Sequence, residues 1–341
     1  MENPRHSVWA DHPLTTGIAA LVCYAGVFND VIGVEEMASR LGVAGRGDFP
    51  EALNELQRRG KIVVRDGFAA LPNLADQIPE KIAKIEKTRQ LIASRRPGLE
   101  SLRRNPILKF VGISGSLAAN NPVKDRNNEV DLDIFLITRA QCLWPFALWQ
   151  SFRNLFPRKR PAIRLCLNYV MDESSLLIAN RNFYTATELR NLIPVSGLET
   201  YRRFLQANRW AEYYYPGMAG EMAPFEPAPT GAWVNKSLYV LFIVLRSVKR
   251  WTLAPIREIS FKGNVRRGTN VHVLRAEYGG YQPLVQKKFG RLAETWFPEL
   301  LDRDLVQKLF PDELSAEIRS GNSHLSAPLL EIMRERHRKY G

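Results

Sequence analysis

The middle of the chain alternates apolar runs with polar turns in a way that predicts two strands joined by a loop. A mostly apolar run over residues 107–111 leads into a turn rich in glycine and serine over residues 112–116. After a polar loop rich in asparagine, residues 130–137 form a second apolar run that carries Asp131 and Asp133. Because successive side chains of a strand point to opposite faces, these two carboxylates share one face.

The pattern continues with a helix and a third strand. Residues 143–156 predict a helix rich in aromatic side chains, and residues 162–171 predict a strand. Asn168 is the polar residue in the middle of that strand, and Asp172 shares its face near the strand end. We therefore expect a core of strands and helices over residues 106–182.

The first 75 residues predict three helices and a hairpin. Helical spacing covers residues 15–28, 33–43 and 49–59, and Asp66-Gly67 lies between two short apolar runs, which is typical of a hairpin turn. This order indicates a winged helix, a variant of the helix-turn-helix, over residues 1–75. Acidic side chains on the third helix favour internal packing or protein binding, with DNA binding as the alternative.

Two further regions are expected to be mainly helical. Residues 76–105 are charged, follow helical spacing and are interrupted at Pro97-Gly98, which predicts a helical connector. In the helical C-terminal region, residues 183–341, a predicted helix over residues 233–253 fits a buried helix better than one at a membrane surface. The fold class expected is α+β: a mixed sheet flanked by helices, an N-terminal winged-helix domain and a helical C-terminal region.

The composition adds a preference for acidic partners. The chain has 341 residues, of which 45% are hydrophobic and 24% charged, and a formal net charge of +13. Such a chain can form two or three domains, and its charge favours nucleic acid, nucleotides or an acidic membrane surface. The three cysteines and five histidines show no metal-ligand spacing.

The sequence predicts a cytoplasmic protein. Its N-terminus lacks the pattern of a signal peptide, and the longest apolar run, residues 238–245, is too short to span a bilayer. We therefore expect no transmembrane segment, with peripheral membrane contact as an open alternative.

Asp131 and Asp133 carry the candidate chemistry. Two like charges on one face of an apolar strand are unfavourable unless a cation lies between them. A pair of Mg²⁺ or Mn²⁺ ions ~3.5–4 Å apart is one such arrangement, and it suits in-line attack on a phosphate. Gly115 lets the backbone approach a ligand closely, and N–H groups that open a helix bind anions. The alternative is an acidic strand edge that is simply solvated.

The spacing of these residues resembles that of nucleotidyltransferases of the DNA polymerase beta superfamily. Gly115-Ser116 follows an apolar strand, and the 14 residues 117–130, a slightly long spacer, lead to Asp131-Leu132-Asp133. The resemblance implies that Asp131 and Asp133 hold two Mg²⁺ ions, and that Gly115 and Ser116 hold the β- and γ-phosphates of an NTP. It also implies transfer of an NMP to a hydroxyl group with release of pyrophosphate.

The third carboxylate of that superfamily is where this chain departs from the pattern. The strand after the Asp pair often carries a carboxylate that binds metal and accepts a proton. Here the middle of that strand holds Asn168, whose oxygen can bind a hard cation but cannot act as a base at neutral pH. Three possibilities follow: Asp172 reaches the site, the acceptor needs little help from a base, or the enzyme is degenerate.

A longer set of motifs extends the resemblance. The positions are Cys166-Leu167-Asn168-Tyr169, Ala186-Thr187-Glu188, Pro194, Tyr201 and Asn208-Arg209-Trp210. Over roughly residues 15–215 the chain is similar to bacterial predicted nucleotidyltransferases with an N-terminal winged helix. This implies that Asn168 is characteristic of the group, and it implies no substrate. Glu188, Tyr201 and Asn208 could line a pocket for the acceptor or the base, or serve helix packing and capping.

We therefore expect a metal-dependent nucleotidyltransferase whose nucleotide and acceptor (small molecule, RNA or protein) are left open. One alternative is a catalytically degenerate protein of the same fold. It would act as a nucleotide sensor, or bind nucleic acid or protein through the winged helix. Another is a scaffold held at a membrane surface by residues 233–254.

Overall fold

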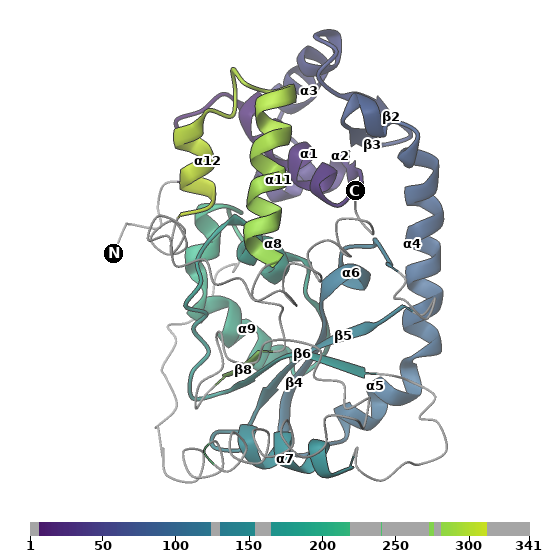
Figure 1. Ribbon diagram of the computed structural model, residues 1–341, viewed down its shortest axis with the longest axis vertical. Helices are drawn as coiled ribbons and strands as arrows, with labels where there is room; N and C mark the ends of the chain where they lie inside the picture. The colour runs from purple at the N-terminus through teal and green to yellow at the C-terminus, as the bar shows by residue number, and fades with distance from the viewer. Residues whose placement is uncertain are drawn as a thin grey trace, which may run out of the picture.

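The structure is a computed structural model that describes residues 7–123, 130–153, 165–218, 240, 273–275 and 281–311. It is an α+β protein, as the sequence predicts, with two sheets and helices around them (Figure 1). The segment expected to be helical over residues 233–253 lies outside the described residues, except for Val240. Within the described ranges, no helix is long and apolar enough to cross a membrane.

The N-terminal unit, residues 7–74, contains the three predicted helices and the hairpin. Its elements are α1 (Leu14–Val27), β1 (Ile32–Gly33), α2 (Val34–Arg40), α3 (Asp48–Arg58), β2 (Val63–Arg65), β3 (Phe68–Ala70) and the 3-10 helix η1 (Pro72–Leu74). β3 pairs antiparallel with β2 on one side and with β1 on the other. Asp66 and Gly67 both have positive φ, at 53° and 76°, which is why an Asp-Gly pair suits this tight turn.

The helix α1 lies at the centre of the unit's core. Its side chains are buried nearly all round, and Ile18 is completely buried. It packs on α3 and also on α11 (Tyr281–Trp296), which is followed by α12 (Arg303–Leu309). A helix that is apolar on every side is stable only when it is enclosed. The N-terminal unit and the C-terminal helices therefore share one continuous hydrophobic core.

The connector consists of two helices, α4 (Gln77–Ser94) and α5 (Arg96–Arg103). In Figure 1, α4 runs along one side of the molecule from the N-terminal unit down to the central sheet. The break lies at Arg95, just before the predicted Pro97-Gly98. Pro97 falls in the first turn of α5, where its missing N–H costs no helical hydrogen bond.

The central sheet has five strands in the order β7-β4-β5-β6-β8. Along the chain, β4 (Leu108–Ile113) is followed by α6 (Gly115–Ala118), β5 (Leu132–Thr138), α7 (Leu143–Arg153) and β6 (Leu165–Asp172). β4 and β5 are antiparallel, whereas β5 and β6 are parallel and are joined through α7. A parallel pair needs a crossover of this kind, and a helix is the usual solution.

Helices cover both faces of this sheet. On one face, Phe135 and Ile137 pack in the core shared with the N-terminal unit. On the other face, Ile134 and Leu136 pack against α5 and against the fully buried Trp144 of α7. The alternation of side chains along β5 matches the period of two predicted from the sequence. Burying a large apolar side chain stabilises the fold by ~1.5–3 kcal/mol, so each layer contributes substantially.

The two edge strands come from outside the predicted core of residues 106–182. They are β7 (Ile193–Ser196), paired with β4, and β8 (Val273–Arg275), paired with β6. The sheet is therefore wider than that boundary, and the region beyond it is not helical throughout. Pro194 has no N–H to donate, and proline in a sheet is confined to edge strands, as here.

Two helices and a 3-10 helix follow β6 and β7. They are α8 (Phe183–Asn191), α9 (Leu198–Ala207) and η2 (Arg209–Tyr213). Asn182 begins α8, because its side chain accepts a hydrogen bond of 2.9 Å from Thr185 N. Gly197 begins α9 with φ at 77°, and a Cβ there would lie 1.9 Å from the carbonyl oxygen of Lys109. Only glycine allows α9 to approach β4 this closely.

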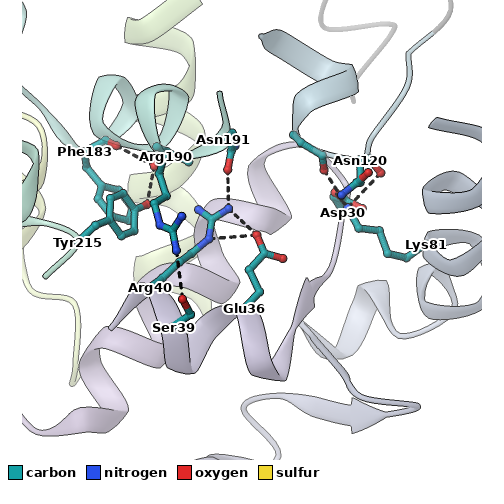
Figure 2. Close-up of polar contacts among 12 residues, drawn as sticks. Asp30, Glu36, Ser39, Arg40, Lys81, Asn120, Phe183, Arg190, Asn191 and Tyr215 are labelled. Atoms are coloured by element: carbon teal, nitrogen blue, oxygen red, sulfur yellow. Dashed lines mark hydrogen bonds and ion pairs between the residues drawn. The ribbon is translucent and has the colours of Figure 1, made fainter. Parts of the chain in front are cut away.

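A polar network around Arg40 joins α2 to α8 (Figure 2). The Arg40 guanidinium bonds Glu36 Oε1 at 2.5 Å and Asn191 Oδ1 at 2.6 Å, and it lies 5.6 Å from the centre of the Tyr215 ring. The Tyr215 hydroxyl is 2.6 Å from Thr187 Oγ1, and burial raises the pKa of Tyr215. Through Arg40, α2 thus contacts α8 within the molecule.

Asn208 closes the loop that follows β6. Its Oδ1 accepts from Ile178 N at 2.8 Å and from Trp210 Nε1 at 3.0 Å. Its Nδ2 donates to the carbonyl oxygens of Leu176 and Phe204, both at 2.8 Å. The side chain is fully buried. These hydrogen bonds give Asn208 a structural role within the fold, and contact with an acceptor is not needed to account for it.

Replacing Asn208 with alanine is expected to lower the free energy of unfolding by about 2–4 kcal/mol, because buried backbone groups lose their partners. Urea unfolding measures the change. The control is Arg202→Ala, which shortens an exposed side chain of the same helix region. A loss no larger in Asn208→Ala than in this control would contradict the structural role.

Candidate functional site

The Gly-Ser turn and the strand with two carboxylates meet at the end of β4. Ser114 N donates to the carbonyl oxygen of Asp133 at 2.9 Å, so the β4–β5 pairing continues into the turn. Gly115 then adopts φ at 68°, and α6 begins. A Cβ at Gly115 would lie 2.2 Å from Asp133 Oδ2. The turn and the carboxylate are therefore in direct contact, although they are far apart in the sequence.

The other predicted residues of the turn and strand lie beside this contact. Ser116 is in the single turn of α6 and is half-buried. Asp131 directly precedes β5, two positions from Asp133, and both aspartates are half-buried. The structure thus brings Gly115, Ser116 and the two aspartates to one end of the sheet.

Ser114 is a residue that the sequence did not single out. It is only 6% exposed, and its Oγ has no hydrogen-bond partner among the described residues. A buried hydroxyl without a partner is unfavourable, by about 1–3 kcal/mol in mutational studies. Its position directly before Gly115 was the available signal, because a serine that ends a buried strand at a turn needs a polar partner.

Asn168 lies on β6, the strand that pairs with β5, which carries Asp133. Asp133 pairs with Cys166 and Phe135 pairs with Tyr169, so β6 carries one extra residue between these pairs. The irregularity changes the predicted alternation of β6. Tyr169 stacks on Phe135, with ring centres 5.0 Å apart, and so belongs to the face of the sheet that carries Asp133. Strict alternation along β6 therefore fails at the extra residue.

Asp172 lies at the opposite end of β6 from the candidate site. It pairs with Thr138, five residues along β5 from Asp133, which is about 16 Å in a strand. The carboxylate is fully buried and accepts bonds from Gln141 N at 2.6 Å and Ser174 N at 2.9 Å. Ser174 Oγ also donates to it, at 2.7 Å. Asp172 therefore does not reach Asp133, and it holds two turns together instead.

Two of the remaining candidates have defined surroundings. Tyr201 stacks on Phe110 with ring centres 5.2 Å apart, and its hydroxyl donates to the carbonyl oxygen of Leu192 at 3.4 Å. Like Asn208, it serves packing. Glu188 is half-buried on α8, and α8 packs against α6. Glu188 is thus carried by a helix that borders the Gly-Ser turn.

The donor set at this end of the sheet fits a hard cation. Carboxylate and amide oxygens suit Mg²⁺, so Asp131 and Asp133 could hold it, with Asn168 of the neighbouring strand as a third candidate. Over the described ranges, no three His, Cys, Asp or Glu side chains gather as a metal site. Any metal here would be completed by phosphate or water oxygens, as is usual for Mg²⁺ bound with a nucleotide.

Comparison with known proteins adds no relative to the resemblance that rests on the motifs. No family model, curated protein or solved structure matches the chain.

Replacing Gly115 with alanine is expected to destabilise the protein more than the same change at Gly60. Both residues have nearly the same positive φ, at 68° and 67°, but nothing lies within 4 Å of a Cβ at Gly60. Backbone strain is therefore matched, and the extra loss at Gly115, about 1–3 kcal/mol, reports the contact with Asp133. Thermal and urea unfolding measure both variants. Equal losses would show that Asp133 moves aside at no cost.

Asp172→Asn is expected to reduce the free energy of unfolding by about 1–3 kcal/mol, since an amide cannot accept all the bonds that the carboxylate accepts. Binding of Mg²⁺ and nucleotide should not change, because the residue lies far from Asp133. Calorimetric titration with Mg²⁺ and nucleotide measures binding. The control is Asp66→Asn, which neutralises an exposed carboxylate in the β2–β3 turn. Loss of nucleotide binding in a folded Asp172→Asn variant would place Asp172 in the site after all.

Proposed function

We propose that the protein is a metal-dependent nucleotidyltransferase, which moves an NMP from an NTP to a hydroxyl acceptor and releases pyrophosphate. The observation that carries the proposal is the contact of Gly115 with Asp133. It puts a turn suited to phosphates against a carboxylate suited to a metal ion. The sequence motif required this proximity, and the antiparallel pairing of β4 with β5 supplies it.

The order of elements around this contact also supports the proposal. A strand, a one-turn helix that begins with Gly-Ser, an antiparallel strand with two aspartates, a helix and a parallel strand follow one another. A mixed sheet with this order of elements supports the proposal of a nucleotidyltransferase core. The three helices and hairpin of the N-terminal unit support its interpretation as a winged helix.

The chemistry would rest mainly on positioning and charge. Asp131 and Asp133 would hold Mg²⁺ or Mn²⁺, with Asn168 as a further oxygen donor. The bound metal supplies charge neutralisation at the phosphates and alignment of the attacking and leaving oxygens. Gly115 and Ser116 would receive the β- and γ-phosphates, so that pyrophosphate leaves toward the turn. The acceptor hydroxyl would attack the α-phosphate from the opposite side.

A nucleotide sensor is the second candidate. The observation that favours it is the placement of Asp172, which leaves β6 without the carboxylate that was one candidate for the base. Asn168 cannot accept a proton at neutral pH. Either the acceptor needs little help from a base, or the protein binds nucleotide without transferring it.

The N-terminal unit is proposed to act within the molecule rather than on DNA. α1 packs on α11, and α2 is held to α8 through Arg40. On α3, Glu51 and Asn54 line an open surface hollow together with Arg58, a mixed surface that is poorly suited to phosphates. The net charge of +13 remains consistent with a nucleotide or nucleic acid as partner. Because NTPs are cytoplasmic metabolites, the proposal places the reaction in the cytoplasm.

Label transfer tests the proposed function. The protein is incubated with each α-labelled NTP, Mg²⁺ or Mn²⁺, and fractionated cell lysate as the source of acceptor. Asp131→Asn/Asp133→Asn is expected to lose transfer by about 10²–10³-fold, since the charges that would hold the metal are removed while shape is kept. Asp66→Asn is the matched control, because asparagine also tolerates its positive φ.

The outcomes separate the two candidates. Transfer by the intact protein and by Asp66→Asn, but not by the double variant, supports the enzyme. Metal-dependent NTP binding that the double variant lacks, with no transfer to any fraction, supports the sensor. Absence of both transfer and binding in the intact protein would contradict the proposal.

A further inference from the structure

A buried ion pair links the N-terminal unit to α4. Lys81 of α4 is only 4% exposed, and its Nζ lies 2.6 Å from Oδ2 of Asp30, in the turn between α1 and β1 (Figure 2). Asp30 is itself buried, and burial raises the pKa of its carboxyl group, although Lys81 partly offsets the effect. Removing both charges from water is unfavourable, and an apolar pair of similar volume would often be at least as stable. Stability alone therefore does not account for the pair.

The same ammonium group holds the far end of α6. Lys81 Nζ donates to the carbonyl oxygens of Ala119 and Asn120, at 3.1 Å and 3.2 Å. With Asp30, these two acceptors use all three N–H bonds of the ammonium group. Ala119 and Asn120 directly follow the single turn of α6, and their N–H groups donate to the carbonyl oxygens of Gly115 and Leu117 within it. Lys81 therefore holds the two residues that close this turn.

A second contact secures the same end of α6. Asn121 Nδ2 donates to the carbonyl oxygen of Phe28 at 3.3 Å, and Asn121 N donates to the carbonyl oxygen of Ser116 at 2.9 Å. The short segment from Gly115 to Asn121 is thus held by α4 and by the end of α1. Its opposite end is the turn that contacts Asp133.

We propose that Lys81 is a positioning residue for nucleotide binding, which holds the far end of α6 so that the Gly115 turn stays against Asp133. Asp30 keeps the ammonium group in place. The inference rests on the proposed nucleotidyltransferase function, because that function assigns the turn to the β- and γ-phosphates. It predicts that loss of Lys81 weakens binding of a triphosphate more than binding of the corresponding monophosphate.

The test uses the full chain and the variant Asp30→Asn/Lys81→Met, which removes both buried charges at once and leaves neither unpaired. Asn121→Ala loosens the same end of α6 without touching the ion pair, and is informative even if the double variant does not fold. Thr88→Val is the control: Thr88 is buried on α4, its hydroxyl has no partner among the described residues, and valine has nearly the same shape.

Two measurements are made on each variant. Calorimetric titration in Mg²⁺ gives the affinity for ATP, GTP, CTP and UTP and for the matching monophosphates. Hydrogen exchange follows the amides of residues 113–121. In folded Asp30→Asn/Lys81→Met and in Asn121→Ala, triphosphate affinity is expected to fall by about tenfold or more and monophosphate affinity by less than about threefold. Exchange over residues 113–121 should accelerate in both, and Thr88→Val should match the intact protein.

Each contrary outcome has a distinct meaning. Faster exchange with unchanged triphosphate affinity would overturn the inference and leave Lys81 as a structural link. Equal weakening of triphosphate and monophosphate would also overturn it, because a general loss of structure affects both. If the intact protein binds no NTP, the proposed function itself fails, and the inference fails with it.

Discussion

The close approach of the Gly115 turn to Asp133 is the constraint on which the rest of the central sheet depends. The backbone must pass within hydrogen-bonding distance of Asp133 O and then reverse without a Cβ in the way. Glycine satisfies both needs, since positive φ carries no steric penalty for it. The turn directs α6 away from the sheet, and it leaves the carboxylate of Asp133 beside the N-terminal end of that helix.

A one-turn helix is not stable by itself, so its surroundings must hold it. Here the support comes from distant parts of the chain. Lys81 and Asn121 tie its far end to α4 and to the end of α1. The N-terminal unit is in turn fixed by the shared core around α1 and by the Arg40 network. The position of the candidate phosphate turn is therefore a property of the whole molecule rather than of the central sheet alone.

One extra residue in β6 interrupts the strict alternation that the sequence predicts for that strand. It lies between Leu167 and Tyr169 and puts Tyr169 on the face of Phe135, whereas the pairing from Tyr169 to Asp172 is regular. Asp172 then fits a purely structural role, with each carboxylate oxygen bonded to a backbone N–H of a turn. Its position along β6, rather than the irregularity, separates Asp172 from Asp133.

The sequence by itself determined the local elements and the key pair of motifs. Apolar periodicity is a property of neighbouring residues, and it predicted the helices of the N-terminal unit and the strands β4 and β5. Only the tertiary structure decided that β7 and β8 complete the sheet, that Asp172 lies at its far end, and that Lys81 supports α6. Strand order, an extra residue in a strand and a buried ion pair all depend on segments that are distant in the chain. Their energies come from contacts that no local pattern encodes.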